Sequence, residues 1–250
     1  MSHQPLAGKV ALVTGGSRGI GAATALRLAD DGADVAITYV SSAEQAKSVV
    51  SRIEQHGVRG EAFASDQADP QQAASLVDKV MAAFGRLDIL VNNAGIFVTG
   101  PIDAAETDLE AMDRQYAVNV AGVVAVTRAA AKVMGEGGRI VSLSSTAADR
   151  AVFPNLGDYS ATKAAITAYT RAWARDLGRR GITVNAVQTS SISTDMNPDV
   201  GSFADVQRSM NALGRFGRPE EMAAAIAFLA GPEAGFVTGA TLNVDGGFSA

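Results

Sequence analysis

Short hydrophobic stretches with strand-like composition alternate with helix-like stretches along nearly the whole chain, and this alternation restricts the fold more than any other feature. The residue pattern predicts strands at 9–14, 34–39, 59–64, 87–91, 139–143, 183–187 and 241–244. It predicts helices at 22–30, 43–55, 70–84, 108–117, 120–134, 158–177 and 220–229. Alternating strands and helices favour a parallel sheet with helices on both faces. We therefore expect an α/β protein with one doubly wound sheet that binds its ligands at the carboxyl ends of the strands.

The composition supports one globular domain. The chain has 250 residues, of which 47% are hydrophobic and 19% charged, and it contains no linker-like or repetitive segment. A chain of this length can bury a substantial core, so residues 1–250 are predicted to form a single domain. The net charge of −5 shows no basic excess, which argues against a nucleic-acid partner.

Several chemistries are excluded by composition. There is no cysteine, and the two histidines are His3 near the start and His56 in a polar stretch, neither in a motif. Thiol nucleophiles, thiolate metal sites and a Ser-His-Asp triad are therefore not expected, and no metal site is predicted. No charged and then apolar leader opens the chain, and no apolar run approaches the length of a membrane span. We expect a soluble, cytoplasmic protein.

A glycine-rich turn follows the first predicted strand. Gly15, Gly19 and Gly21 lie between the strand 9–14 and the helix 22–30, which is the setting of a phosphate-binding loop. Glycine lets the backbone approach a pyrophosphate, and the helix N-terminus offers free N–H groups. A glycine cluster alone can also be an ordinary tight turn.

Tyr159 and Lys163 are four positions apart in a predicted helix, so they lie on one helix face. An ammonium close to a phenol lowers the pKa of the phenol, which would favour proton exchange with a substrate oxygen near neutral pH. The alternative is a half-buried tyrosine beside a solvated lysine.

Taken together, these residues resemble the short-chain dehydrogenase/reductase family over essentially the whole chain. Its cofactor loop is similar to residues 14–21, its Asn-Asn-Ala-Gly motif to residues 92–95, and its active-site asparagine to Asn119. Ser145 precedes Tyr159 by fourteen residues, within the family's usual range, and Lys163 completes the set. Residues 215–221 and 243–247 resemble the branch of 3-oxoacyl-carrier-protein reductases. The resemblance implies a Rossmann-type sheet and a homotetramer that associates through the helices at 121–134 and 159–177.

The resemblance also implies the catalytic roles. Tyr159 would be the general acid in carbonyl reduction, and Lys163 would hold the nicotinamide ribose and favour ionisation of Tyr159. Ser145 would bind the substrate oxygen, and Asn119 would hold a water that links Lys163 to solvent. Ser144 is a rival for the role of Ser145, which could also be a turn serine. A helix cap is the alternative for Asn119.

NADP is the implied cofactor. NAD sites usually have a carboxylate at the end of the second strand, whereas residues 39–42 of this chain read Tyr-Val-Ser-Ser. Arg18 could bind a 2′-phosphate, or it could be a solvated loop arginine. Asp66 would face the adenine amino group, or it could be a turn aspartate. The predicted cofactor contacts are Gly15, Ser17, Arg18, Gly19, Ile20, Gly21, Tyr39, Ser41, Ser42, Asp66, Gln67, Asn93, Ala94, Gly95, Tyr159, Lys163, Ile192 and Thr194.

The chain departs from the family after the strand 183–187. Thr189 and Ser190 occupy the place of the family's Pro-Gly pair. A Pro-Gly loop would be better pre-organised, so one hypothesis is that restoring it tightens NADPH binding. The competing hypothesis is that the two hydroxyls bind cofactor or substrate. Residues 189–213 are expected to form a mobile lid over the substrate.

Apolar residues near these segments suggest an apolar substrate pocket, although each could instead be ordinary core or a subunit contact. They are Phe97, Val152, Phe153, Leu156, Met196, Phe203 and Met210. The sequence thus predicts an NADPH-dependent reductase that converts a ketone, aldehyde or 3-oxoacyl group to an alcohol. The alternative is a non-catalytic, nucleotide-binding regulatory protein that retains the fold.

Overall fold

The computed structural model describes residues 4–105 and 107–250; of the residues considered above, His3 lies outside this range. Seven parallel strands form a single sheet in the order β3-β2-β1-β4-β5-β6-β7. They are β1 (Val10–Val13), β2 (Asp34–Tyr39), β3 (Gly60–Ala64), β4 (Ile89–Asn92), β5 (Arg139–Ser145), β6 (Thr183–Thr189) and β7 (Thr241–Val244). The order reverses between β1 and β4, and this switch point opens a crevice at their carboxyl ends. The expected doubly wound sheet is confirmed.

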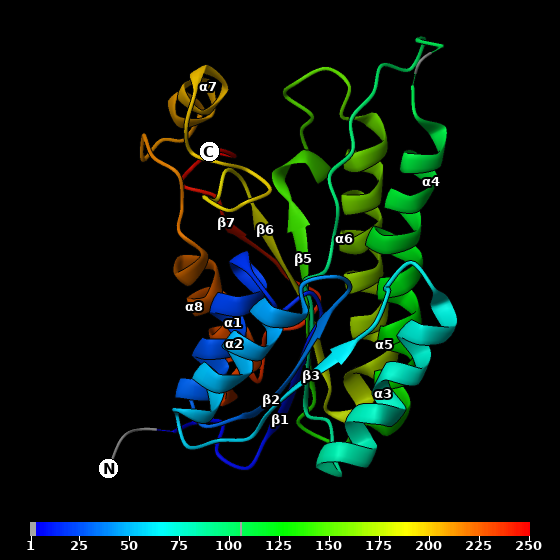
Figure 1. Ribbon diagram of the computed structural model, residues 1–250, viewed down its shortest axis with the longest axis vertical. Helices are drawn as coiled ribbons and strands as arrows, with labels where there is room; N and C mark the ends of the chain where they lie inside the picture. Colours follow the sequence, from blue (N-terminus) through cyan, green and yellow to red (C-terminus); the bar gives the residue numbers. More distant parts are fainter. Residues whose placement is uncertain (1–3, 106) are drawn as a thin grey trace.

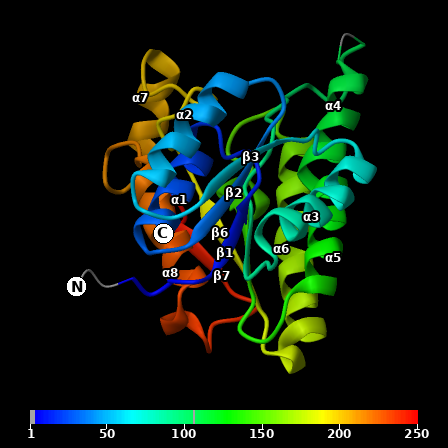
Figure 2. The ribbon, with the colours of Figure 1, turned by 60° about the horizontal axis from the view of Figure 1, so that its bottom comes forward.

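Helices cover both faces of the sheet (Figure 1). One layer contains α1 (Gly19–Asp30), α2 (Ala43–Glu54) and α8 (Pro219–Ala230). The other contains α3 (Pro70–Phe84), α4 (Leu109–Tyr116), α5 (Val123–Val133) and α6 (Gly157–Leu177). Figure 2 shows the two layers on either side of the strands. Each layer packs on the sheet around its own cluster of buried apolar residues. Leu28 and Ile226 belong to the cluster under the first layer, and Leu76 and Val126 belong to the cluster under the second.

The helix of α4 and α5 is continuous, which the sequence did not predict. A π-helical turn, Ala117–Gly122, joins the two segments, so that one helix runs from Leu109 to Val133. By length and composition alone this helix could cross a membrane, but 44% of its most apolar window is buried inside the protein. It packs against α3 and α6.

The expected lid contains regular structure. Residues Ser202–Met210 form helix α7, a helix that was not predicted from the sequence. α7 stands above the carboxyl ends of β6 and β7 in Figure 1. Gln207 anchors it: its side chain is buried, accepts a 2.8 Å hydrogen bond from the Ser191 hydroxyl and donates one of 3.0 Å to the Asn197 side chain.

Candidate active site

A cavity of about 840 Å³ lies at the carboxyl ends of the strands. The glycine loop and the ends of β2, β3 and β4 form one part of its wall. The end of β5, the start of α6 and the segment from β6 to α7 form the other. Every predicted site residue except Asn119 lines it.

The glycine loop is held against β4 by a dense set of hydrogen bonds. The Asn93 amide donates to the carbonyl oxygens of Thr14 (2.8 Å) and Gly15 (3.0 Å). The Thr14 hydroxyl accepts from the backbone N–H groups of Asn93 (3.1 Å) and Ala94 (3.0 Å). Gly15 has a φ of +64°, and a Cβ at Gly21 would lie 2.3 Å from the Gly15 oxygen. Glycine is required at both positions, and the loop leads directly into α1 as a phosphate-binding loop does.

The cavity beside β2 suits a phosphate. Tyr39, Ser41 and Ser42 line it, and none of them carries a negative charge. The guanidinium of Arg18 is largely exposed and lies 3.9 Å from the carboxylate of Asp195. Arg18 thus lies at the cavity in an exposed ion pair with Asp195, a lid residue that the sequence did not single out.

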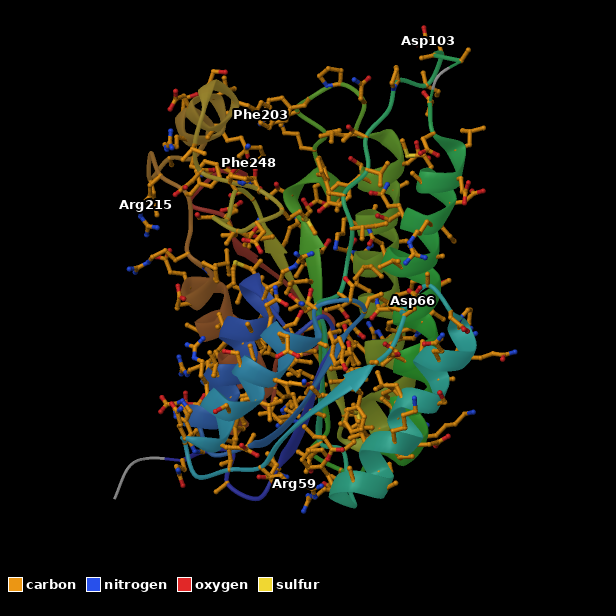
Figure 3. All side chains as sticks on the ribbon, viewed as in Figure 1. Arg59, Asp66, Asp103, Phe203, Arg215 and Phe248 are labelled. Carbon is orange, nitrogen blue, oxygen red and sulfur yellow. The ribbon has the colours of Figure 1, made fainter. Side chains whose placement is uncertain are left out.

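Asp66, at the end of β3, acts as a turn residue and is also ion-paired. Its carboxylate accepts from the backbone N–H of Ala68 at 2.9 Å. It also pairs at 3.1 Å with Arg114, a cavity residue on α4 that the sequence reading did not single out. In Figure 3, Asp66 lies below and to the right of Phe203, which lines the same cavity.

The side chain of Gln67 forms hydrogen bonds within the protein. It is buried and donates to the carbonyl oxygens of Ala94 (3.3 Å) and Val118 (2.9 Å). These bonds fix the end of β4 against the π-helical turn. Gln67 lines the cavity, but its side-chain N–H groups already donate to these two backbone carbonyl oxygens.

Ser145, rather than Ser144, faces the tyrosine. Ser145 ends β5, and its hydroxyl is within hydrogen-bond reach of the Tyr159 side chain. It also accepts from the backbone N–H of Ala147 at 3.2 Å, so it serves as a turn serine too. Ser144 is buried and donates to the carbonyl oxygen of Lys163 at 3.1 Å. Alternation of side chains along a strand thus separates the two candidates.

Lys163 is buried beneath Tyr159. Its Nζ donates to the carbonyl oxygen of Leu143 at 3.1 Å and lies 5.8 Å from the centre of the Tyr159 ring. Burial disfavours the charged amine and lowers the pKa of Lys163 to about 8. The alternative of a solvated surface lysine is wrong.

The expected direction of the Tyr159 pKa shift is not found. Burial raises the pKa of Tyr159, and the hydrogen bond from Ser145 opposes this only in part. Lys163 is not among the groups that lower the Tyr159 pKa; its ammonium lies over the ring, 5.8 Å from the ring centre, and donates to the carbonyl oxygen of Leu143. The neutral phenol is therefore the dominant form at pH 7.

Asn119 lies inside the π-helical turn and is not a helix cap. Its Oδ1 accepts from the backbone N–H of Ile96, and its Nδ2 donates to the Ile96 carbonyl oxygen, both at 2.9 Å. Nδ2 also lies 3.2 Å from the Thr162 hydroxyl. A Cβ at Gly95 would lie 3.3 Å from Oδ1 of Asn119 and 3.6 Å from Nζ of Lys163. The π-helical turn brings the asparagine, a backbone loop and the lysine together, as such turns often do at functional sites.

The segment after β6 closes the cavity opposite the glycine loop. Thr194 faces that loop, since a Cβ at Gly19 would lie 3.4 Å from its methyl carbon, and the buried Ile192 forms a β-bridge with Gly217. Thr189 pairs with Ser145 on one side and Val244 on the other. The Ser190 hydroxyl lies 2.7 Å from the carbonyl oxygen of Asp245.

Aromatic and aliphatic side chains line the remaining wall. The ring of Phe97 packs edge-on against Tyr159 at 4.8 Å, and that of Phe153 lies 5.1 Å from Phe203 on α7. Val152, Leu156 and Met196 also line the cavity, whereas Met210 does not. Six of the seven predicted apolar residues thus line the cavity.

No cluster of three or more His, Asp or Glu side chains suited to a metal occurs among the described residues. His56 pairs at 3.3 Å with Asp30 on the surface.

Comparison with known proteins agrees with this arrangement. Residues 15–249 match the family model described as enoyl-(acyl carrier protein) reductase. A short-chain dehydrogenase from Burkholderia cenocepacia J2315, crystallised with NADP, superposes with a TM-score of 0.96; it is 52% identical, and the match covers 98% of this chain and 100% of that one.

Two curated relatives bear different names. The cyclic-di-GMP-binding biofilm dispersal mediator protein of Escherichia coli K12 is 43% identical over 97% of this chain and 98% of its own length. The 3-oxoacyl-[acyl-carrier-protein] reductase of Synechocystis is 40% identical over 97% of both chains.

Proposed function

This chain belongs to the short-chain dehydrogenase/reductase family of oxidoreductases, and we propose that it reduces a ketone, aldehyde or 3-oxoacyl group to an alcohol with NADPH. One observation carries the proposal: Tyr159, Ser145 and Lys163 line the same cavity as the glycine loop, and Tyr159 lies close to the other two side chains. A protein that only senses a nucleotide does not need this set.

The residues present fit NADP. The Gly15 turn and the N-terminus of α1 suit the pyrophosphate, and Arg18 beside the uncharged end of β2 suits a 2′-phosphate. The relative from Burkholderia was crystallised with NADP. The cofactor, when bound, supplies the hydride for the carbonyl carbon.

The protein residues supply the proton and stabilise the developing charge. Because burial raises the pKa of Tyr159, its hydroxyl holds a proton at pH 7 and can pass it to the carbonyl oxygen as that oxygen becomes negative. The Ser145 hydroxyl would donate a hydrogen bond to the same oxygen. Protonated Lys163, with a pKa of about 8, would stabilise the phenolate that remains until solvent reprotonates it.

Asn119 would position the active-site backbone. Its carboxamide clamps both backbone groups of Ile96 next to Gly95 and Lys163. The water-mediated link to Lys163 implied by the family remains part of the proposal. The second lone pair of the Asn119 oxygen would be available for it.

A panel of carbonyl compounds tests the activity directly. Ketones, aldehydes and a 3-oxoacyl thioester are incubated with the protein and NADPH, and loss of nicotinamide absorbance is followed. Turnover of at least one class is expected. Tight NADPH binding without turnover of any class would contradict the proposal.

A regulatory nucleotide-binding protein is the second candidate. It is favoured by the name of the 43% identical relative from Escherichia coli and by three arginines that line the cavity, Arg18, Arg114 and Arg150. Calorimetric titration with cyclic di-GMP, with and without NADPH, distinguishes the two. Micromolar binding of cyclic di-GMP together with no turnover would favour this candidate.

We further propose a cytoplasmic homotetramer. Leu109, Tyr116 and Val133 on the long helix are exposed apolar residues, which is a common property of subunit interfaces. Light scattering should give four times the chain mass of 25.6 kDa, and a monomer at micromolar concentration would refute the assembly.

A further inference from the structure

The segment that follows β7 folds into a closed turn organised by Asp245. The Asp245 side chain is buried, and its carboxylate accepts hydrogen bonds from the backbone N–H groups of Gly247 (2.9 Å) and Ser249 (3.1 Å). The N–H of Phe248 lies 3.2 Å from the Asp245 carbonyl oxygen. One carboxylate thus fixes the backbone on both sides of Phe248.

This turn packs on the end of the lid and places Phe248 in the wall of the cavity. The N–H of Leu213 donates to the Gly246 oxygen at 3.0 Å, and a Cβ at Gly247 would lie 2.7 Å from that of Ala212. Phe248 lines the same cavity as Tyr159. Phe248 and Phe203 both lie at the α7 end of the molecule in Figure 3.

Ser190 connects this turn to the active-site loop. Its hydroxyl lies 2.7 Å from the Asp245 carbonyl oxygen and 3.3 Å from Oδ1 of Asn211. A hydroxyl has one proton, so Ser190 donates its hydrogen bond to the nearer acceptor, the Asp245 carbonyl oxygen. Ser190 stands where the family has glycine. The hydroxyl at this position has a partner in the protein that glycine could not reach.

We propose that Ser190 is a positioning residue that acts through Asp245 to hold Phe248 against the substrate, and that Phe248 selects substrates with an apolar substituent. This inference rests on the proposed carbonyl reduction. Phe248 would contact the substituent where the cavity is closed by the lid. Phe203 and Met196 of the lid line the same cavity and would contact it too. A small ketone would not reach the ring.

Two ketones of different size test the specificity role. We expect Phe248→Ala to raise KM about 3- to 10-fold for 4-phenyl-2-butanone and to leave that for 2-butanone within about twofold, because it removes one apolar contact. Ser190→Ala should shift the same ratio by about 2- to 10-fold, as loss of one hydrogen bond does. Ser190→Thr, which keeps a hydroxyl, should retain the parent's ratio of the two KM values. Ser209 is an exposed serine on α7, and Ser209→Ala should not change this ratio.

A double variant distinguishes positioning from direct binding. If Ser190 acts through Phe248, Ser190→Ala should have no further effect on the KM ratio in a Phe248→Ala background. Fully additive effects would overturn the coupling. A change in the dissociation constant of NADPH with no change in the KM ratio would instead make Ser190 a cofactor residue, which also overturns the proposal.

Hydrogen exchange provides a readout that does not need turnover. In Ser190→Ala, the amides of Gly247 and Ser249 should exchange faster, whereas unchanged exchange would overturn the proposal. If the parent protein reduces no carbonyl, the proposed activity fails on its own. Saturation-transfer NMR with 4-phenyl-2-butanone then replaces KM, and unaltered binding in Phe248→Ala would overturn the selection role.

Discussion

The hydroxyl of Ser144 donates a 3.1 Å hydrogen bond to the backbone carbonyl of Lys163. This bond joins β5 to α6 and engages the only proton of the Ser144 hydroxyl, although Ser144 also lines the cavity. The next residue, Ser145, faces Tyr159. The two adjacent serines thus differ in their hydrogen-bond partners, which are the Lys163 carbonyl oxygen for Ser144 and the Tyr159 side chain for Ser145.

The two serines should respond differently to alanine. Ser145→Ala is expected to lower kcat about 100- to 1000-fold, because a donor to the developing oxyanion is removed. Ser144→Ala should retain most activity and lose about 1 kcal/mol of unfolding free energy, since it removes a buried hydrogen bond. Steady-state kinetics and urea unfolding measure both. The reverse pattern would exchange their roles.

Removing the phenol hydroxyl should separate chemistry from binding. Tyr159→Phe keeps the ring that packs on Phe97 but loses the proton donor, so turnover should fall to near zero while NADPH still binds. Kinetics together with calorimetric titration check this. Activity within tenfold of the parent would remove Tyr159 from the proton transfer.

Arg18 should determine the preference for NADPH over NADH. Loss of a charge-assisted phosphate contact costs about 1.5–3 kcal/mol, or roughly 10- to 150-fold in kcat/KM, so Arg18→Ala should erase most of the preference. Arg52→Ala, an exposed arginine on α2, is the matched control. Equal use of both cofactors by the parent would contradict this assignment.

Lys163 should impose a pH-dependent cost on stability. Its pKa is lowered from 10.5 to about 8 in the folded protein, so the unfolded chain binds more protons between these values and stability rises with pH. The cost is full below pH 8 and is relieved as pH approaches 10.5. From pH 7 to 9.5 the parent should therefore gain about 2 kcal/mol relative to Lys163→Met.

Urea unfolding of both proteins at the two pH values measures this gain. The comparison with Lys163→Met cancels the titration of the other groups. A constant difference between parent and variant would show that Lys163 does not titrate in this range.

Restoring the family's Pro-Gly pair should increase neither the stability of the protein nor its affinity for NADPH. Thr189 is paired on both sides within the sheet, where proline is disfavoured, and Ser190→Gly removes the bond to Asp245. Thr189→Pro with Ser190→Gly should therefore cost at least about 1 kcal/mol of stability without tightening NADPH binding. Calorimetry and urea unfolding test this. A fourfold or larger gain in affinity would support the opposite prediction made from the sequence.

Local pattern alone was enough to predict the sheet, the glycine loop and the Tyr159–Lys163 pair. Strand composition, glycine spacing and the four-residue helical repeat are short-range properties that can be read along the chain. They could not predict the lid helix α7, whose buried Gln207 is a polar residue that becomes an anchor only when its partners Ser191 and Asn197 are in place. The continuous helix through Asn119 was missed for a similar reason, since its π-helical turn is formed where Gly122 packs against Gln67.

The sequence by itself determined the fold, the candidate site residues and the uncharged end of β2. Only the tertiary structure decided that Ser145 rather than Ser144 faces Tyr159, that burial raises the Tyr159 pKa, and that Ser190 bonds to Asp245. The physical reason is that burial and hydrogen-bond partners are set by residues distant in the chain. Ser190 and Asp245 are 55 positions apart, and packing of the lid on the segment after β7 brings them into contact.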